Sequence, residues 1–141
     1  ERLLLVFPEG ARGTAKLAKD ADSLVDFGTG FMRLALETKT PIVPFAFVGG
    51  GEALPTVAYL RRLGRLFGVP YIPVSKWGVL FPKPTRFQLI YGKSMMFVGS
   101  GHERDEVLHG MVAQVKERIR DLIQQGRALR EKKISEEDLV L

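Results

Sequence analysis

The pattern of apolar and polar positions predicts three strands, two from apolar runs and one from alternation. Leu3–Phe7 is a run of five apolar residues, long enough for one buried strand, and Pro8 ends it because proline cannot continue a β-ladder. Pro41–Val48 is a second apolar run, punctuated by prolines, and predicts a second buried strand. Arg86–Tyr91 alternates polar and apolar residues over most of its length, which indicates a half-exposed or edge strand.

Residues at helical spacing predict one short helix and one long helix. Thr29–Thr38 suits the short helix, whose face is expected to carry Phe31, Leu34 and Ala35, with Thr38 as an optional fourth member. Asp105–Arg130 predicts the long helix, with Asp105 as its N-cap and Gly126 as a weak point near its end. We interpret its apolar stripe as core packing, with a lipid groove as the alternative; the stripe contains Val107, Leu108, Met111, Val112, Val115, Ile119, Leu122, Ile123 and Leu129.

The remaining segments are less regular. Glu52–Phe67 has apolar residues at helical spacing and predicts a broken helix. Val69–Pro84 contains four prolines, which exclude a long helix. Beyond Glu131 the chain is polar, and Ser135–Asp138 has the pattern of a capping box for a short terminal turn.

Composition indicates one globular domain. The chain has 141 residues, of which 45% are hydrophobic and 26% charged. No run of 18 apolar residues is present, so this piece of chain contains no transmembrane helix. The absence of cysteine excludes disulfides and thiolate metal sites and fits a reducing compartment. The net charge of +5 favours anionic partners such as phosphate headgroups, anionic membranes, acyl carriers or nucleic acid, with solubility alone as the alternative.

Three polar or flexible residues follow the first predicted strand. Glu9, Gly10 and Arg12 leave the strand at its C-terminal end, the edge at which open α/β sheets bind ligands. Arg12 offers a planar fork of donors that matches phosphate oxygens, and Gly10 permits unusual backbone angles. Glu9 and Arg12 are close enough in sequence to pair with each other. The alternatives are a charged turn residue and an ordinary surface arginine.

Three motifs carry a resemblance to a known family. Phe7–Arg12, which reads F-P-E-G-A-R, resembles the F-P-E-G-T-R block of the glycerolipid and lysophospholipid acyltransferases. Pro41–Pro44 is similar to that family's later P-x-V-P block, and Phe27–Phe31 to its glycine-then-helix segment. The resemblance implies an α/β fold over residues 1–130, the C-terminal part of an acyltransferase-type mixed sheet flanked by helices, with the long amphipathic helix and then a polar tail over 131–141.

The resemblance also implies an activity for the parent protein. The parent would move a fatty acyl group from coenzyme A or acyl carrier protein to a glycerolipid hydroxyl, and Glu9, Gly10 and Arg12 would form the acceptor-binding wall. Glu9 would bind the acceptor hydroxyl, or orient Arg12 and a catalytic histidine. No metal or further cofactor is implied. Ala11 and Gly13 replace the family's usual Thr and Ser, so a neutral acceptor stays open, with Arg12 then serving structure or the donor's phosphates.

The family's catalytic H-x-x-x-x-D motif is not found in these residues. Val107 lies five residues after His102, and Gln114 lies five after His109. We therefore expect no catalytic residue here, a general base further upstream in the parent, and no activity from these 141 residues alone. Both histidines are interpreted as solvated. Gly28–Gly30 and Gly99–Gly101 are weaker candidates for binding an anion through backbone N–H groups.

The segment Tyr59–Arg86 combines basic and aromatic residues. This composition suits a membrane interface, and the alternative is an ordinary insert whose apolar side lies in the core. No motif supports nucleic-acid binding. We expect the parent to be membrane-associated on the cytoplasmic side. The rival hypothesis is a non-catalytic module that binds membrane surfaces or anionic lipids. The basic and aromatic residues are Tyr59, Arg61, Arg62, Arg65, Phe67, Tyr71, Lys76, Trp77, Phe81, Lys83 and Arg86.

Overall fold

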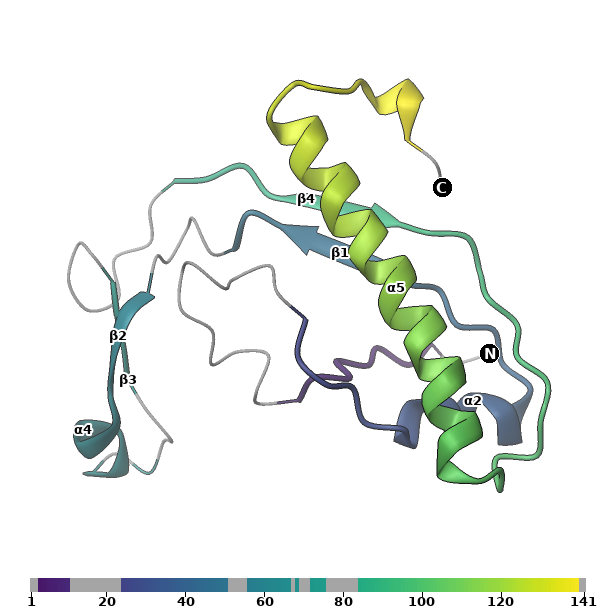
Figure 1. The fold of residues 1–141 in the computed structure, drawn as a ribbon. Helices are drawn as coiled ribbons and strands as arrows, with labels where there is room; N and C mark the ends of the chain where they lie inside the picture. Colours follow the sequence, from purple (N-terminus) through teal and green to yellow (C-terminus); the bar gives the residue numbers. More distant parts are fainter. Residues whose placement is uncertain are drawn as a thin grey trace.

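The computed structural model describes residues 3–10, 24–50, 56–66, 68, 72–75 and 84–139. The fold is α/β, as predicted, and combines short strands with helices (Figure 1). The elements in chain order are α2 (Gly30–Thr38), β1 (Phe45–Val48), β2 (Thr56–Leu60), α4 (Arg61–Leu66), β3 (Ile72–Ser75), β4 (Gln88–Tyr91), α5 (Asp105–Arg130) and the 3-10 turn η2 (Glu136–Asp138).

The central sheet is an antiparallel pair of β1 and β4. Phe45 lies opposite Tyr91, and Phe47 lies opposite Leu89. Side chains alternate between the two faces of the pair, so the half-exposed strand predicted over Arg86–Tyr91 is confirmed in β4. The strand predicted over Pro41–Val48 is shorter than expected and is buried on only one face.

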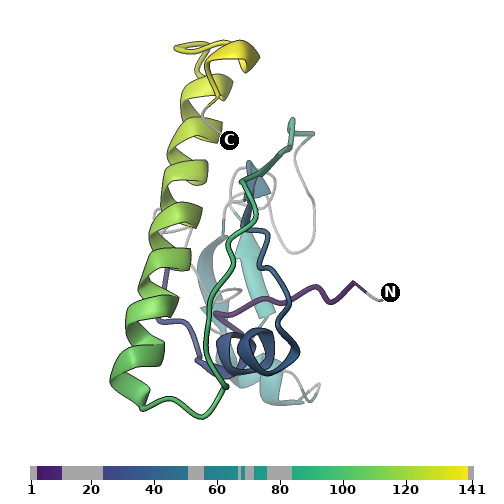
Figure 2. The ribbon, with the colours of Figure 1, turned by 90° about the vertical axis from the view of Figure 1, so that its right-hand side faces the viewer.

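Helix α5 covers the buried face of this sheet and continues past it to α2 (Figure 2). Leu122 packs with Ala46 and Ile90 of the sheet. The first half of α5 contributes Leu108, Val112 and Val115 to a second cluster, which also contains Phe27, Met32 and Leu36. Each fully buried side chain of this kind contributes about 1.5–3 kcal/mol. The interpretation of the α5 stripe as core packing is therefore confirmed, except at Val107, which is 48% exposed.

Helix α2 has almost the predicted bounds but buries a different face. It ends at Thr38, after which Lys39 takes a left-handed conformation with φ 49°. Its buried residues are Met32 and Leu36, whereas Leu34 is 42% exposed. Of the expected face, Phe31 packs against the core but Leu34 does not, because contact with α5 selects the side of so short a helix and the sequence pattern of α2 alone does not contain that contact.

The N-terminal segment differs most from expectation. Leu3–Phe7 has no strand conformation, and its side chains are exposed, from Val6 at 37% to Leu3 at 98%. The prediction of a buried strand is wrong for this structure. The physical reason is that no strand in the described part of the chain pairs with this segment, so its apolar residues have no layer to pack against.

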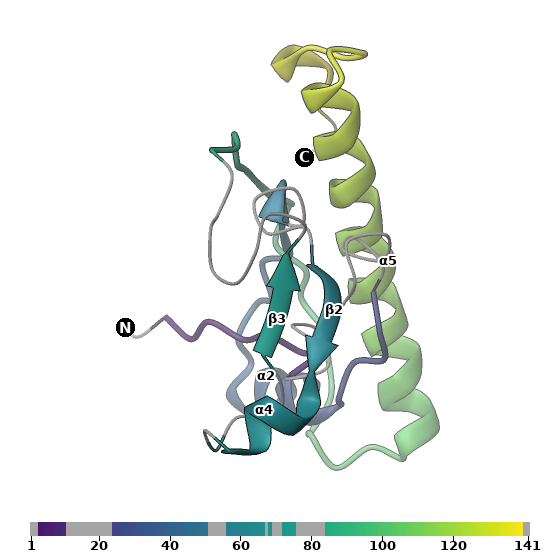
Figure 3. The ribbon, with the colours of Figure 1, turned by 90° about the vertical axis from the view of Figure 1, so that its left-hand side faces the viewer.

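A second antiparallel pair, β2 and β3, lies at the end of the molecule away from α2 and α5 (Figures 1 and 3). Helix α4 lies between the two strands in sequence and contacts β3. The broken helix predicted over Glu52–Phe67 is thus wrong for Thr56–Leu60, where cross-strand pairing outweighs the helical spacing. Among the described residues, no helix is both long and apolar enough to cross a bilayer.

Candidate functional site

The F-P-E-G block forms a tight turn. The N–H of Gly10 donates to the carbonyl of Phe7 at 3.0 Å, which closes the turn over Pro8 and Glu9. Gly10 has φ +56°, in the left-handed region where a residue with a Cβ is strained. A Cβ at this position would meet no atom within 4 Å, so the backbone angle, and not space, favours glycine here.

Two hydrogen bonds join this turn to the segment before α2. The carboxylate Oε1 of Glu9 accepts the backbone N–H of Val25 at 2.6 Å. The N–H of Gly28 donates to the carbonyl of Pro8 at 3.1 Å. The predicted site residue Glu9 therefore positions the backbone of a segment 16 residues later in sequence, a role that its type alone does not reveal.

The same segment is also attached to α5. The Lys116 ammonium lies 5.6 Å from the centre of the Phe27 ring and 3.5 Å from Oδ1 of Asp26. The Asp26 carboxylate is almost fully exposed, so this ion pair is worth little, and the buried Phe27 side chain carries most of the attachment. The turn at Glu9 thus rests on the main core through residues 24–28.

Arg12, the third predicted site residue, lies outside the described residues, and so do Ala11 and Gly13. Its expected pairing with Glu9 stays a prediction. Of the three residues predicted to bind the acceptor, the structure brings Glu9 and Gly10 together in one turn.

The glycine segment Gly28–Gly30 does not present all its N–H groups to a ligand. Gly28 already donates to Pro8, and Gly30 begins α2. The carbonyl of Thr29 accepts the first N–H groups of the helix, from Met32 at 3.0 Å and from Arg33 at 3.1 Å. The segment acts as the start of a helix that is also held to the F-P-E-G turn.

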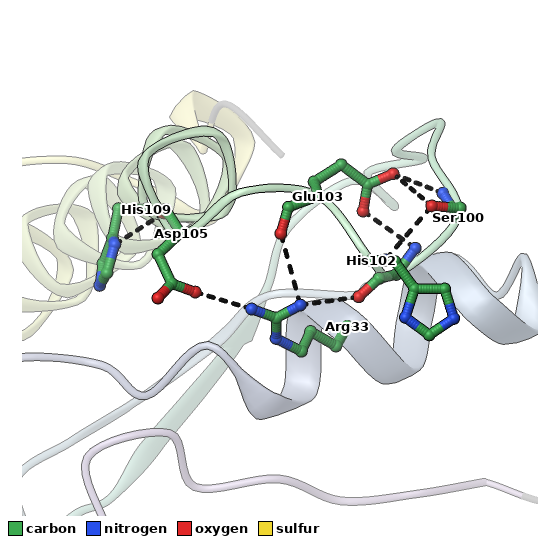
Figure 4. Close-up of polar contacts among 7 residues, drawn as sticks. Arg33, Ser100, His102, Glu103, Asp105 and His109 are labelled. Atoms are coloured by element: carbon green, nitrogen blue, oxygen red, sulfur yellow. Dashed lines mark hydrogen bonds and ion pairs between the residues drawn. The ribbon is translucent and has the colours of Figure 1, made fainter.

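The second glycine segment binds an anion that belongs to the protein. The Glu103 carboxylate accepts the backbone N–H groups of Ser100 at 2.5 Å and Gly101 at 2.9 Å (Figure 4). The hydrogen bond from the Ser100 N–H is the main cause that lowers the pKa of Glu103 below its ordinary value. The anion bound by Gly99–Gly101 is therefore the Glu103 side chain of the protein itself, which already accepts the N–H groups of Ser100 and Gly101.

Arg33 joins this loop to α2 (Figure 4). Its guanidinium donates from Nη1 to the carbonyl of Gly101 at 2.9 Å and from Nη2 to Oδ1 of Asp105 at 2.7 Å. Asp105 was predicted as an N-cap, but Arg104 occupies that position and Asp105 lies in the first helical turn. No pattern in the sequence indicates this role of Arg33, because its partners lie 68 and 72 residues away.

The two histidines form no catalytic or metal site with these groups. The His102 side chain is exposed, and its backbone N–H donates to the Ser100 hydroxyl at 3.2 Å. The His109 ring nitrogen Nδ1 lies 2.7 Å from the carbonyl of Asp105, within the helix. In the part of the chain that the structure describes, no group of three or more His, Cys, Asp or Glu side chains is placed to hold a metal ion.

The chain is similar to longer, uncharacterised mycobacterial proteins. The chain is 34% identical over 131 residues to an uncharacterised protein of Mycobacterium leprae, covering 87% of this chain and 35% of the relative. It is 32% identical over 131 residues to uncharacterised proteins of Mycobacterium tuberculosis and Mycobacterium bovis, covering 87% of this chain and 36% of each relative. The chain thus spans about a third of the length of these curated relatives. No solved structure matches it.

The family match covers the region that contains the Glu9 turn, the segment tied to it, and α2 with β1. Residues 1–48 match the family described as Acyltransferase. The resemblance seen in Phe7–Arg12 and Pro41–Pro44 is therefore confirmed by an acyltransferase match over residues 1–48.

Proposed function

We propose that the chain is part of an enzyme that transfers a fatty acyl group from a thioester to a glycerolipid hydroxyl. The donor would be acyl-coenzyme A or acyl carrier protein, and no metal is required. The observation that carries the proposal is the Glu9–Val25 hydrogen bond of 2.6 Å, together with the family match over residues 1–48. This bond holds the turn at Glu9, which lies three residues before Arg12 in the sequence.

In this proposal the chain supplies the wall that binds the acceptor. Glu9 holds the turn in place, Gly10 supplies its left-handed backbone angle, and Arg12 binds an oxyanion of the acceptor headgroup through its planar fork. By resemblance to the family, a histidine outside these 141 residues removes the hydroxyl proton. The acceptor oxygen then bonds to the thioester carbonyl carbon, the carbon–sulfur bond breaks, and the thiol leaves with the proton.

The test is steady-state kinetics on the full-length protein, with release of the donor thiol as readout. A lysophospholipid and a monoacylglycerol serve as charged and neutral acceptors. Arg12→Ala should weaken the charged acceptor by roughly ten- to two-hundred-fold, because charge-assisted hydrogen bonds contribute about 1.5–3 kcal/mol. Arg104→Ala is the matched control, since it removes an exposed arginine at the start of α5. An unchanged kcat/KM for both acceptors removes Arg12 from the site.

A second assay tests the division of labour between this chain and the rest of the parent. We propose that residues 1–141 alone transfer no acyl group, because neither His102 nor His109 has an aspartate five residues later. Thioester-dependent acylation of a glycerolipid by these residues alone contradicts the proposal. Such activity would require another general base, which His102→Ala and His109→Ala would identify.

A membrane-surface role is the second candidate, and it is favoured by exposed residues of α4, the helix that follows β2. Leu66 of α4 is 78% exposed, and the neighbouring Arg62 and Arg65 are exposed too. An exposed leucine beside arginines suits the boundary of an anionic bilayer, where each basic residue contributes about 1 kcal/mol. This feature supports membrane association on the cytoplasmic side. Trp77 and Lys76, named with this segment in the sequence, lie outside the described residues.

Vesicle sedimentation of the full-length protein tests this second role. Binding to anionic vesicles should fall in high salt, because charges on an exposed surface are screened over about 8 Å at physiological ionic strength. Arg62→Glu with Arg65→Glu should reduce binding, whereas Arg104→Glu with Arg120→Glu, the same charge change on α5, should not. Equal loss from both pairs indicates a general charge effect and contradicts a docking role for α4.

A further inference from the structure

One face of the β1–β4 sheet is apolar and uncovered. We call it the aromatic face; it consists of Phe7, Phe45, Phe47, Phe87, Leu89 and Tyr91. Phe47 is 54% exposed and Tyr91 is 56% exposed, although both are in paired strands. Large apolar patches that stay open on a soluble surface mark places where another surface binds.

The residues of the aromatic face are already arranged as a packing surface. The rings of Phe47 and Phe87 stack with centroids 5.1 Å apart. The Phe45 ring contacts Tyr91 at 6.0 Å and the edge of Phe7 at 6.4 Å, in a T-shaped arrangement. These contacts hold the rings in fixed positions before any partner arrives, which reduces the entropy lost on binding.

The opposite face of the same sheet is covered by α5. Ala46 and Ile90 pack against Leu122 of α5, and Gly126 lets that helix approach Val48 closely. Because β1 and β4 carry apolar residues on both faces, the sheet has the pattern of a layer buried on both sides. Helix α5 is one of the two covering layers, and the second would cover the aromatic face.

Leu3–Phe7 adds information about the chemistry of the missing layer. In the part of the chain that the structure describes, no backbone hydrogen bond connects Leu3–Val6 to a strand. The segment reaches the aromatic face through its last residue, Phe7. A lipid tail can cover apolar side chains, but it cannot satisfy backbone N–H and C=O groups, whereas a polypeptide strand does both.

We propose that polypeptide from outside these 141 residues, belonging to the same chain, pairs with Leu3–Phe7 as a strand and covers the aromatic face. The curated relatives are about three times as long as the matched region, so further polypeptide of this kind exists in them. A segment of the same chain reaches the face at a high effective concentration, which favours it over a second copy. The proposal concerns assembly of the fold and does not depend on the reaction or its substrates.

Thiol labelling of the full-length protein tests the proposal. These 141 residues contain no cysteine, so single cysteines report single sites once any others in the parent are replaced by serine. Phe47→Cys and Leu89→Cys probe the aromatic face, and Gln114→Cys on the exposed side of α5 is the matched control. We expect a maleimide to label the two probes at least about 100-fold more slowly than the control, because only opening of the fold exposes them.

Each other outcome overturns the proposal. Equal labelling rates at all three positions show that the aromatic face is open. Protection that appears only as protein concentration rises identifies a second copy, and protection that requires added vesicles identifies a bilayer. Hydrogen exchange of the unsubstituted full-length protein needs no variant: the amides of Leu4–Val6 should be protected, and exchange at the rate of an unstructured peptide contradicts the strand pairing.

Discussion

Arg33 and Asp105 form an ion pair of 2.7 Å across 72 residues of sequence, and it joins α2 to the first turn of α5. Asp105 is well exposed, so the pair itself is worth about 0–1 kcal/mol. The carbonyl of Gly101 lies 2.9 Å from the same guanidinium, and because Gly101 is buried, bulk water cannot replace Arg33 as its donor. Arg33 therefore acts mainly through the backbone that it satisfies.

This difference gives the first prediction. Arg33→Ala should lower the free energy of unfolding by about 1–3 kcal/mol, because the buried carbonyl loses its donor. Asp105→Asn, which removes only the exposed partner's charge, should cost less than about 1 kcal/mol. Urea denaturation of the purified protein measures both. Equal losses would mean that the ion pair, and not the carbonyl contact, carries the stability.

Glu103 gives a prediction about acid. Hydrogen bonds from the backbone N–H of Ser100 and its neighbours lower the pKa of Glu103 below its ordinary 4.5. A carboxylate with a lowered folded-state pKa stabilises the fold above about pH 4.5, and that contribution is lost as pH falls through the lower folded value.

The measurement is stability against pH. Wild type should exceed Glu103→Gln at neutral pH, and the two curves should converge as the pH falls below about 4.5. Glu106→Gln removes the same charge from the first turn of α5 without touching the loop, and serves as the control. A constant difference between wild type and Glu103→Gln across this range would show that ionisation of Glu103 is not the cause.

Two glycines of α5 should respond in opposite directions to the same substitution. A Cβ at Gly126 would lie 2.7 Å from Cγ2 of Val48, so Gly126→Ala should cost about 1–3 kcal/mol through overpacking. A Cβ at Gly110 meets nothing within 4 Å, so Gly110→Ala should gain about 0.5–1 kcal/mol from helix propensity. Thermal unfolding measures both changes. Val48→Ala should relieve part of the cost at Gly126, and an additive double variant would contradict the contact.

Gly10 and Gly28 offer a similar comparison at the candidate site. Gly10→Ala should cost about 1–2 kcal/mol because of its φ of +56°, and Gly10→Asn should cost less, since asparagine tolerates left-handed angles. Gly28 has open space and no positive φ, so Gly28→Ala should leave stability nearly unchanged. Identical costs at the two positions would show that the turn does not depend on the angle at Gly10.

Patterns within one element predicted the helices well. The long helix has the expected bounds, Asp105–Arg130, because its apolar stripe repeats over enough turns to fix both type and length. Gly126 was misread as a weak point, since propensity contains no information about Val48 on another element. Leu3–Phe7 is exposed in this structure for a related reason: an apolar run indicates what a strand would bury, but not whether its partner lies within these residues.

The candidate site was predictable only in part. The sequence predicted that Gly10 permits an unusual backbone angle, which its φ of +56° confirms, whereas the binding role proposed for Glu9 and Gly10 stays a prediction. The hydrogen bond from Val25 to Glu9 could not be predicted, since any of many backbone N–H groups satisfies a carboxylate equally well. Arg33 was missed because nothing within α2 indicates the loop that it binds.

The position of α5 has a consequence for the way the protein melts. The helix has 26 residues and is therefore about 39 Å long, and it contributes Val112 to one cluster and Leu122 to the other. Unravelling either end shortens the hydrogen-bonded segment that supports the other. The α2 region and the β1–β4 sheet share few direct contacts, yet they should lose structure in a single cooperative transition because one helix belongs to both.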